Sequence, residues 1–412
     1  MEGLPQRPVK VAKRSALGLD SVNFFTAAVQ TAFGAFLTVY LVKNQWPPQA
    51  GGLALTVSTL SGLFSQIPAG AYIDSVHDKR RVVLGGIVGV GLAALLLCVT
   101  AAKVAVFFAL AVQGLASAFI APGIAAISLA LVGRAALSER IGRNARFASI
   151  GNGLAAGMMG IAGSYLPAAS VFLVAAALTL PALLSLLLIS PGVAADASSV
   201  EKVQITWKGV KTLLLDRRLA VFAACVVLFF ASSAAIGPLI AAQVTTHRPD
   251  FATLVVAGTI LLPQAIVAAI SPWVGRRAEI SGRRPMLLLG WGLLPLQGLT
   301  YAVLTGPYAL VLCYLLSAVS GAVFGVLLAV VAADLTRGTG WFNLTLGALG
   351  VAISIGASLS TFFGGLALAA VGDRLAAIGL ALVGLFGLLL MWLGMPETQS
   401  SGDDAGTKIG VT

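Results

Sequence analysis

Long apolar runs, separated by short stretches of charged and turn-forming residues, follow one another along this chain of 412 residues. A run of roughly 20 apolar residues is long enough to cross the hydrocarbon core of a bilayer as a helix. Such runs predict membrane-spanning helices at residues 16–42, 50–72, 82–101, 104–132, 146–166, 169–190, 219–243, 252–273, 286–304, 308–332, 343–368 and 375–395. We therefore predict an all-α integral membrane protein with twelve spans.

The longest polar connection divides these runs into two sets of six. It covers residues 191–218 and predicts a linker between an N-terminal bundle, residues 16–190, and a C-terminal bundle, residues 219–395. Residues 1–15 and 396–412 form the two predicted tails. Trp207 and its basic neighbours in the linker fit either a short amphipathic segment on the membrane surface or an ordinary solvated loop.

Composition and charge narrow the class of protein. Hydrophobic residues make up 58% of the chain and charged residues 10%, whereas soluble domains carry roughly a quarter charged residues. This excludes a cytosolic enzyme, a secreted disulfide scaffold and a nucleic-acid-binding domain. The net charge of +11 follows the topology, because all but four of the 26 basic residues lie in alternate connections. Basic loops stay on the cytoplasmic side, so we expect both termini in the cytoplasm and a bacterial inner membrane as the location.

A short pattern of glycine, acidic and basic residues follows the second run and recurs after the eighth. The first copy holds Gly70, Asp74, Lys79, Arg80 and Arg81, and the second holds Gly275, Glu279, Gly282, Arg283 and Arg284. The glycine and the acid both recur after 205 residues (275 − 70 and 279 − 74). A second echo aligns Asn144 and Gly151 with Asn343 and Gly350, 199 residues later (343 − 144 and 350 − 151). The chain therefore contains an internal repeat of six spans.

With twelve predicted spans, a 6+6 plan and this repeated pattern, the whole chain resembles the major facilitator superfamily. The second copy matches the family pattern Gly-x-x-x-Asp-x-x-Gly-Arg-Arg/Lys, with Glu279 in the acidic place, whereas the first has His77 and Asp78 where the family has Gly and Arg. The resemblance implies two pseudo-symmetric bundles that rock about a central site, with both copies as conformational gates. A carboxylate could itself favour one state by capping a helix of the other bundle, or the segment could be a charged turn that only fixes topology.

Ionisable side chains within spans are costly in lipid, and Asp20 is the carboxylate that falls within an apolar run. Two interpretations stay open. Asp20 could be the protonation site that couples transport to a proton gradient, because burial favours the neutral form of a carboxyl group. Alternatively, it could cap the first helix at the headgroup level, near Lys13 and Arg14.

The resemblance implies that helices 1, 4, 7 and 10 line the central cavity. Neutral polar, small and aromatic residues in these four runs are the candidate cavity residues: Asn23, Gln30, Thr31, Gly34, Gln113, Ser117, Ser232, Ser233, Tyr314, Ser317 and Phe324. Such a lining suits an amphipathic or weakly charged solute better than a sugar or a strongly anionic metabolite.

We expect a secondary active transporter that moves a small organic solute by alternating access, with proton-coupled efflux as the preferred direction. An uptake permease for a small metabolite, proton-coupled or facilitative, is the alternative, and a non-transporting membrane receptor or assembly factor is the second. No catalytic group, cofactor or metal site is expected, because phosphate-binding loops, catalytic triads and Cys/His clusters do not occur in the sequence. The expected partners are a small-molecule substrate and the lipid bilayer, with no nucleic acid, and we expect a monomer.

Overall fold

The computed structural model describes residues 13–33, 35–190, 216–235, 252–304 and 307–399, and every regular element in these ranges is a helix. The N-terminal bundle contains α1 (Lys13–Thr31), α2 (Ala35–Lys43), α3 (Pro48–Ser75), α4 (Lys79–Val99), α5 (Lys103–Val132), α6 (Leu137–Tyr165) and α7 (Ser170–Leu187). The C-terminal bundle contains α10 (Arg217–Ser233), α12 (Ala252–Ser281), α13 (Arg283–Val303), α14 (Pro307–Leu335) and α15 (Phe342–Gly394).

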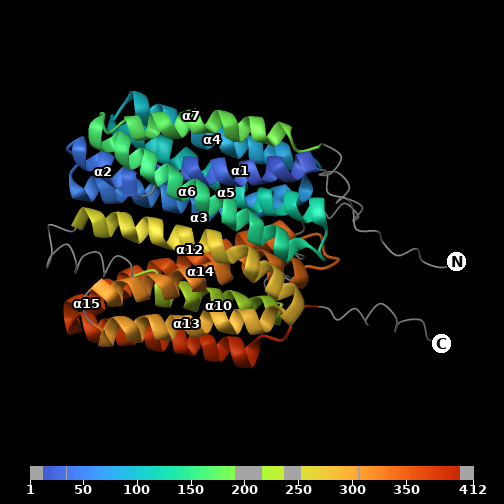
Figure 1. The fold of residues 1–412 in the computed structure, drawn as a ribbon. Coiled ribbons are helices and arrows are strands. Elements are labelled where there is room, and N and C mark those ends of the chain that lie inside the picture. The colour runs from blue at the N-terminus through green and yellow to red at the C-terminus, as the bar shows by residue number, and fades with distance from the viewer. Residues whose placement is uncertain (1–12, 34, 191–215, 236–251, 305–306, 400–412) are drawn as a thin grey trace, which may run out of the picture.

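The two bundles lie side by side with their helices roughly parallel or antiparallel (Figure 1). They meet along two pairs of helices, α3 against α15 and α6 against α12. Helix α1 begins and α15 ends at the same end of the molecule, which we call the termini end. Within the described residues, nine segments are long and apolar enough to cross a membrane. The fold is therefore that of an all-α membrane protein.

Local sequence explains where several helices begin and end. The side chain of Asp78 accepts a hydrogen bond from the backbone N–H of Arg80 and caps α4, and Asp216 caps α10 in the same way. Gly282 separates α12 from α13 with φ of 90°, a backbone conformation that glycine adopts without strain. Gly372, with φ of 79° and ψ of 173°, interrupts α15 where the last two predicted spans meet.

Each bundle has its own apolar core. The N-terminal core contains Leu19, Val90 and Phe172, and the C-terminal core centres on Trp291 and Phe222, all of them buried. Most predicted spans match the helices except at some ends, but the span predicted at 16–42 contains two helices, α1 and α2, and the end of the span predicted at 219–243 lies outside the described residues. Helix α6 begins at Leu137 rather than at residue 146, and α12 continues to Ser281 rather than ending at residue 273. Charged residues that the sequence placed in connections therefore lie on helices.

Candidate functional site: a cavity between the bundles

A cavity of about 700 Å³ lies between the two bundles. Helices α1, α3, α5 and α6 of the N-terminal bundle and α12, α14 and α15 of the C-terminal bundle form its wall. The polar members of the wall are Asn23, Thr26, Gln30, Thr31, Gln66, Ser117, Asn144, Asn152 and Gln264. The other wall residues are apolar or glycine, and no ionisable side chain occurs among them. The volume is in the range of pockets that hold small organic ligands.

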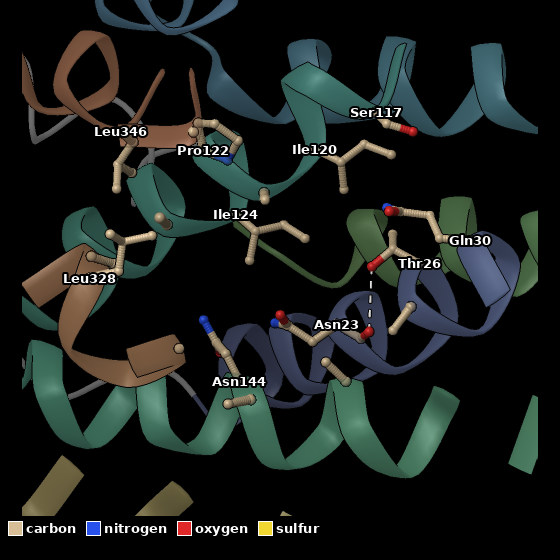
Figure 2. Close-up of a pocket in the computed structure, with 18 of the residues that line it drawn as sticks. Asn23, Thr26, Gln30, Ser117, Ile120, Pro122, Ile124, Asn144, Leu328 and Leu346 are labelled. Atoms are coloured by element: carbon tan, nitrogen blue, oxygen red, sulfur yellow. Dashed lines mark hydrogen bonds between the residues drawn. The ribbon is translucent and has the colours of Figure 1, made fainter. Parts of the chain in front are cut away.

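Polar side chains of the neighbouring helices α1 and α6, among them Asn23 and Asn144, lie on the same side of the cavity (Figure 2). Asn23 donates to the carbonyl of Leu19 at 2.7 Å, and Thr31 bonds to Asn152 at 3.0 Å. Apolar residues of α5 and α14, including Ile120, Ile124 and Leu328, form another part of the wall. The cavity therefore offers both hydrogen-bonding and apolar surfaces.

Four of the predicted cavity residues belong to this wall, and the other described candidates do not. Asn23, Gln30, Thr31 and Ser117 belong to the wall. Gln113 lies behind it, where it accepts from Ser58 at 2.6 Å and donates to Ser117 at 3.0 Å. Gln113 therefore fixes a wall residue. Gly34 lies outside the described residues.

The candidates of α10 and α14 do not belong to the wall that the structure describes. Ser232 and Ser233 both donate to the carbonyl of Phe229 at 2.9 Å, so their hydroxyls are satisfied within α10. Phe324 is buried in an aromatic cluster, stacked on Phe229 with ring centroids 4.7 Å apart. The remaining two candidates, Tyr314 and Ser317, lie on α14 outside the wall.

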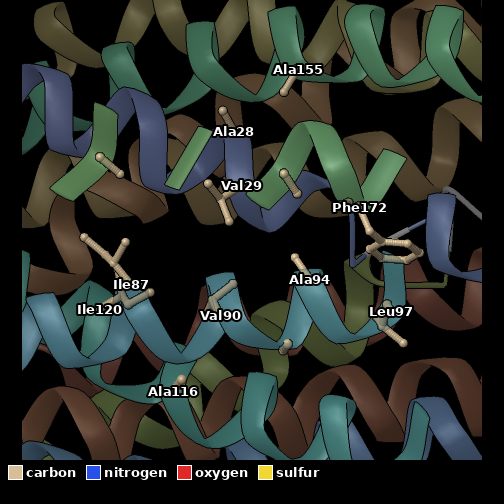
Figure 3. Close-up of a cluster of buried hydrophobic side chains, with 14 of the residues drawn as sticks. Ala28, Val29, Ile87, Val90, Ala94, Leu97, Ala116, Ile120, Ala155 and Phe172 are labelled. Carbon is tan, nitrogen blue, oxygen red and sulfur yellow. The ribbon is translucent and has the colours of Figure 1, made fainter. Parts of the chain in front are cut away.

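The wall helices of the N-terminal bundle are held by the apolar core behind them. Val29 of α1, Val90 of α4 and Ala116 of α5 meet there, and all three are buried (Figure 3). Ile120 belongs both to this core and to the cavity wall. Close packing of this kind limits movement of α1 and α5 relative to each other, so the bundle forms a firm support for the site.

Asp20 lies outside the wall, in an ionic cluster between α1 and α6 in which Asp20 and Arg140 are buried and Arg143 is exposed. The Asp20 side chain is only 2% exposed. Arg140 Nη2 is 2.5 Å from Asp20 Oδ1, and Arg143 Nη2 is 2.6 Å from Asp20 Oδ2. The partners of Asp20 are thus two arginines of α6, not Lys13 and Arg14. A buried carboxylate needs such partners, because an unpaired charge is very costly in a low-dielectric interior.

Asn144 connects this ionic cluster to the cavity. Its Oδ1 accepts from Arg140 Nε at 2.8 Å and from Arg140 Nη2 at 2.6 Å. Its Nδ2 donates to the hydroxyl of Ser128 on α5 at 2.8 Å. Because Asn144 also belongs to the wall, a change at Asp20 can reach the cavity through Arg140 and Asn144.

Two sets of contacts join the bundles at the termini end. We call them the α3–α15 seam and the α6–α12 seam. In the α3–α15 seam, Asp74 Oδ1 accepts from the backbone N–H of Asn343 at 3.1 Å and from Asn343 Nδ2 at 2.7 Å. Asp74 Oδ2 accepts from the backbone N–H of Leu344 at 2.8 Å. Asp74 therefore caps the positive N-terminal end of α15 across the interface between the bundles.

The α6–α12 seam repeats this arrangement with fewer hydrogen bonds. Glu279 Oε1 accepts from the backbone N–H of Glu139 in the first turn of α6 at 3.2 Å. Gly70, Asp74, Gly275 and Glu279 lie on the last turns of α3 and α12, rather than in loops. The sequence prediction of gate loops is corrected in this respect, because both helices run beyond the apolar segment.

Glycines let backbones of the two bundles touch in both seams. A Cβ atom at Gly70 would overlap the carbonyl of Asn343, and one at Gly275 would overlap the carbonyl of Ser138. In the same way, Gly347 meets the carbonyl of Gln66, and Gly142 meets that of Ser271. Each pair maps onto the other with an offset of 205 residues (275 − 70, 343 − 138, 347 − 142 and 271 − 66).

This common offset corrects the alignment of the second echo. The counterpart of Gly142 is Gly347, so the alignment at 199 residues is wrong by six. Gly151, which packs on the carbonyl of Phe24, corresponds to Gly356, which packs on that of Val227. The sequence carried a signal for this register, because Ser-Ile-Gly ends at both Gly151 and Gly356.

The basic residues beside the seams bind helix ends rather than the cavity. Lys79 Nζ donates to the carbonyls of Ile73 and Val76 at the end of α3, and Arg81 pairs with Asp78 at 3.1 Å. Arg80 lies in the same first turn of α4. In the second copy, Arg283 Nε is 3.3 Å from Asp334 Oδ2, and Arg284 Nη2 donates to the carbonyl of Trp392 at 2.7 Å.

Two further contacts at the termini end were not foreseen from the sequence. Arg134, between α5 and α6, donates to the carbonyl of Ala333 on α14 and so joins the two bundles. Glu397 accepts from the backbone N–H groups of Arg283 at 2.9 Å and Arg284 at 3.0 Å, capping α13 from beyond the end of α15. Neither residue lies in an apolar run or in the repeated pattern, so no sequence signal pointed directly to them.

Comparison with known proteins agrees with the architecture. The family model described as Major Facilitator Superfamily matches residues 19–354. Two curated proteins of Mycobacterium tuberculosis, one from strain CDC 1551 / Oshkosh and one from strain ATCC 25618 / H37Rv, are 33% identical over 401 residues. The match covers 95% of this chain and 96% of each relative, and both relatives are described as uncharacterized MFS-type transporters.

Solved structures share the fold at low sequence identity. The human organic anion transporter MFSD10 superposes with a TM-score of 0.70 at 16% identity, covering 92% of this chain and 98% of its own. The transporter FucP in its outward conformation gives 0.73 at 15% identity with the same coverage. A variant of this E. coli fucose:proton symporter gives 0.74 at 14% identity, again with 92% and 98% coverage.

Proposed function

Because the chain belongs to the major facilitator superfamily and is a secondary membrane transporter, we propose that it moves a small amphipathic or weakly charged organic solute by alternating access. The cavity carries this proposal. It is about 700 Å³, both bundles contribute to it, and its wall combines amide and hydroxyl groups with apolar side chains. A wall without ionisable side chains among the described residues offers no counter-charge to a strongly charged solute.

Alternating access requires the cavity to open at one end while it is closed at the other. The two seams hold the termini end closed, through Asp74 on α15 and Glu279 on α6. We place the termini end in the cytoplasm, because most basic residues lie in the connections on that side. Opening would then separate α3 from α15 and α6 from α12.

We propose export as the direction and the proton gradient as the energy source. Asp20 is the candidate for the coupling proton. Its protonation would weaken the pairing with Arg140 and Arg143, and Arg140 holds Asn144 in the cavity wall. FucP, which shares the fold, is a proton symporter by name, so proton coupling is compatible with this architecture.

Reconstituted flux tests the proposal. Solutes that raise the thermal stability of the purified protein would be identified first, since a ligand that binds the folded state stabilises it. Their transport into and out of proteoliposomes would then be measured under a pH gradient of either sign. We expect gradient-driven export. Gradient-driven uptake would instead favour a permease, and absence of flux for every binding solute would favour a non-transporting receptor.

Asp20→Asn tests the proton site within the same assay. We expect binding to persist and gradient-driven flux to be lost. Asp78→Asn is the matched control, because Asp78 is a carboxylate at the same end that only caps α4 and pairs with Arg81. Unchanged gradient-driven flux in Asp20→Asn would remove the coupling role of Asp20.

A further inference from the structure

Gln66 of α3 belongs to the cavity wall and to the α3–α15 seam at the same time. Its backbone carbonyl group lies against Gly347, where a Cβ atom could not fit. Its side chain lies on Gly350, where a Cβ atom would come within 2.5 Å of Gln66 Oε1. One side chain of the N-terminal bundle thus rests on the backbone of α15 at the edge of the cavity.

Only one of the two polar atoms of the Gln66 side-chain amide has a hydrogen-bond partner in the part of the chain that the structure describes. Its Oε1 is buried and has no hydrogen-bond partner among the described residues. Its Nε2 lies 3.5 Å from the hydroxyl of Ser354, which is a long and weak contact.

The hydroxyl of Ser354 decides which end of the amide lacks a partner. A serine hydroxyl has one hydrogen, and Ser354 donates it to the carbonyl of Gly350 at 3.1 Å. The hydroxyl can therefore only accept from Gln66, so the amide nitrogen must face Ser354. As long as Ser354 donates to Gly350, exchanging the oxygen and nitrogen of Gln66 would place two acceptors against each other and lose this contact. The unsatisfied atom is the carbonyl oxygen, an acceptor.

The equivalent position of the opposite seam has no such acceptor, and the buried hydroxyl of that seam that lacks a partner among the described residues, on Ser138, does not belong to the cavity wall. Ser271 corresponds to Gln66 under the 205-residue offset (271 − 66), and its hydroxyl donates to the carbonyl of Val267 at 2.7 Å. The cavity wall also contains Gln264 on α12, whose Oε1 is not among the buried unsatisfied atoms. The unmet acceptor is therefore a particular feature of Gln66 rather than of wall glutamines in general.

We propose that Gln66 is the specificity-determining residue that accepts a hydrogen bond from the solute. The cavity then selects amphipathic solutes that carry a hydroxyl or N–H group over equally apolar solutes that lack one. This inference rests on the proposed function. Because Oε1 is buried against Gly350, the amide must turn away from α15 to reach the solute, so recognition also loosens the α3–α15 seam.

Two naphthalene probes test the selectivity. 2-Naphthol carries a hydroxyl donor, and 2-methoxynaphthalene has the same ring system with a methyl group in place of that hydrogen. Affinities of the full-length protein in detergent at pH 7 would be taken from the rise of its unfolding midpoint with probe concentration. We expect about threefold to tenfold tighter binding of 2-naphthol, the range expected for one neutral hydrogen bond.

Variants assign that preference to one side chain. Gln66→Met keeps the length of the side chain and removes the acceptor, so the two probes should bind equally. Gln264→Met removes the other wall glutamine and should keep the preference. If Gln66→Met does not fold, Gln66→Asn withdraws the amide by one methylene, and the preference should fall towards unity.

The outcomes separate the inference from the function on which it rests. Equal binding of both probes by the wild type, or an unchanged preference in a folded Gln66→Met or Gln66→Asn variant, would overturn the role of Gln66 and leave the proposed function intact. If neither probe binds the wild type, the amphipathic cavity itself is disproved, and the inference falls with it.

Movement of the seam is measured separately. Spin labels at Ser75→Cys and Arg337→Cys, with the three native cysteines replaced by alanine, report the distance between the two bundles at the termini end. We expect saturating 2-naphthol to broaden this distance distribution towards longer values and 2-methoxynaphthalene to leave it unchanged. An identical response to both probes would overturn the link between recognition and the seam.

Discussion

The two bundles repeat each other where backbones touch and differ where side chains meet. Both seams use the same glycine-to-carbonyl contacts under one offset of 205 residues. Between α1 and α6, however, Arg140 and Asn144 form a buried polar cluster with Asp20, whereas the counterparts Thr345 and Leu349 on α15 carry no charge. The closing geometry is thus common to both halves, while the chemistry near the cavity is concentrated in one.

The largest expected effect lies in the polar cluster. Arg140→Gln should lower the free energy of unfolding by about 3 kcal/mol, because it removes one partner of a buried ion pair and releases Asn144. The counterpart change Thr345→Val should alter it by less than about 1 kcal/mol, because the hydroxyl of Thr345 has no hydrogen-bond partner among the described residues. Unfolding in a denaturing detergent series would measure both, with the exposed Arg81→Gln as control. Equal losses at positions 140 and 345 would refute the asymmetry.

The two seams should respond alike when a glycine at the contact is replaced by a larger residue. Gly70→Val and Gly275→Val each place side-chain atoms where a carbonyl of the other bundle lies, so each should reduce solute flux at least about tenfold by preventing closure of the termini end. Gly52→Val, on the same helix as Gly70 but with open space where its Cβ atom would lie, should retain flux. A strong loss at only one of the two seam glycines would show that the seams do not share the closing role.

The carboxylates of the two seams should differ. Asp74→Asn disturbs a cap of three hydrogen bonds and should weaken closure by about 1.5–3 kcal/mol, the range for bonds to a charged group. Glu279→Gln disturbs a longer and weaker contact, with the backbone N–H of Glu139 at 3.2 Å, and should weaken closure by less than about 1 kcal/mol. A cysteine at the wall residue Ala145, in a background without native cysteines, would report opening through its rate of modification by an impermeant thiol reagent. Faster modification in Glu279→Gln than in Asp74→Asn would reverse the ranking.

The smallest expected effect concerns the first turns of α4 and α13. Helix α4 is capped by the side chain of the residue before it, Asp78, whereas the residue before α13 is Gly282, which has no side chain, and Glu397 caps this helix instead. Burial alone would raise the pKa of the Glu397 carboxyl, but four backbone N–H groups outweigh burial and hold this pKa below its ordinary value of 4.5. A depressed pKa means that the ionised carboxylate stabilises the fold above about pH 4.5 and that this contribution is lost as the pH falls through the lowered value.

Thermal unfolding between pH 3 and pH 7 tests this contribution. Glu397→Gln should lower the unfolding midpoint at pH 7, and the difference from the wild type should disappear at the acid end. Parallel profiles across the whole range would contradict a stabilising role for the ionised Glu397.

The spans and the closing contacts could be predicted because they depend on local patterns. Apolar runs define most helices within a few residues, and the glycine and acidic positions of the repeat mark the seams. The possibility that a carboxylate caps a helix of the other bundle is confirmed for Asp74. Such features need only chain periodicity and the chemistry of helix ends.

The position of the polar cluster could not be predicted, because its arginines lie in a charged stretch of the sequence. Arg140 and Arg143 lie in a stretch that is charged enough to resemble a connection, yet it forms the first turns of α6. Their pairing with Asp20 joins positions more than a hundred residues apart and depends on the rotation of two helices about their axes. The rotation of α14 about its own axis likewise buries Phe324 in an aromatic cluster, and that of α5 leaves Ser117 on the wall; no single-helix pattern distinguishes these two outcomes.

The cavity wall has one further consequence. Among the described residues, Gln264 is the only polar wall residue from the C-terminal bundle, whereas eight come from the N-terminal bundle. A chimera that joins this N-terminal bundle to the C-terminal bundle of a relative should therefore inherit the solute preference of its N-terminal parent, and evolutionary change of substrate in this lineage should fall mainly within the first half of the gene.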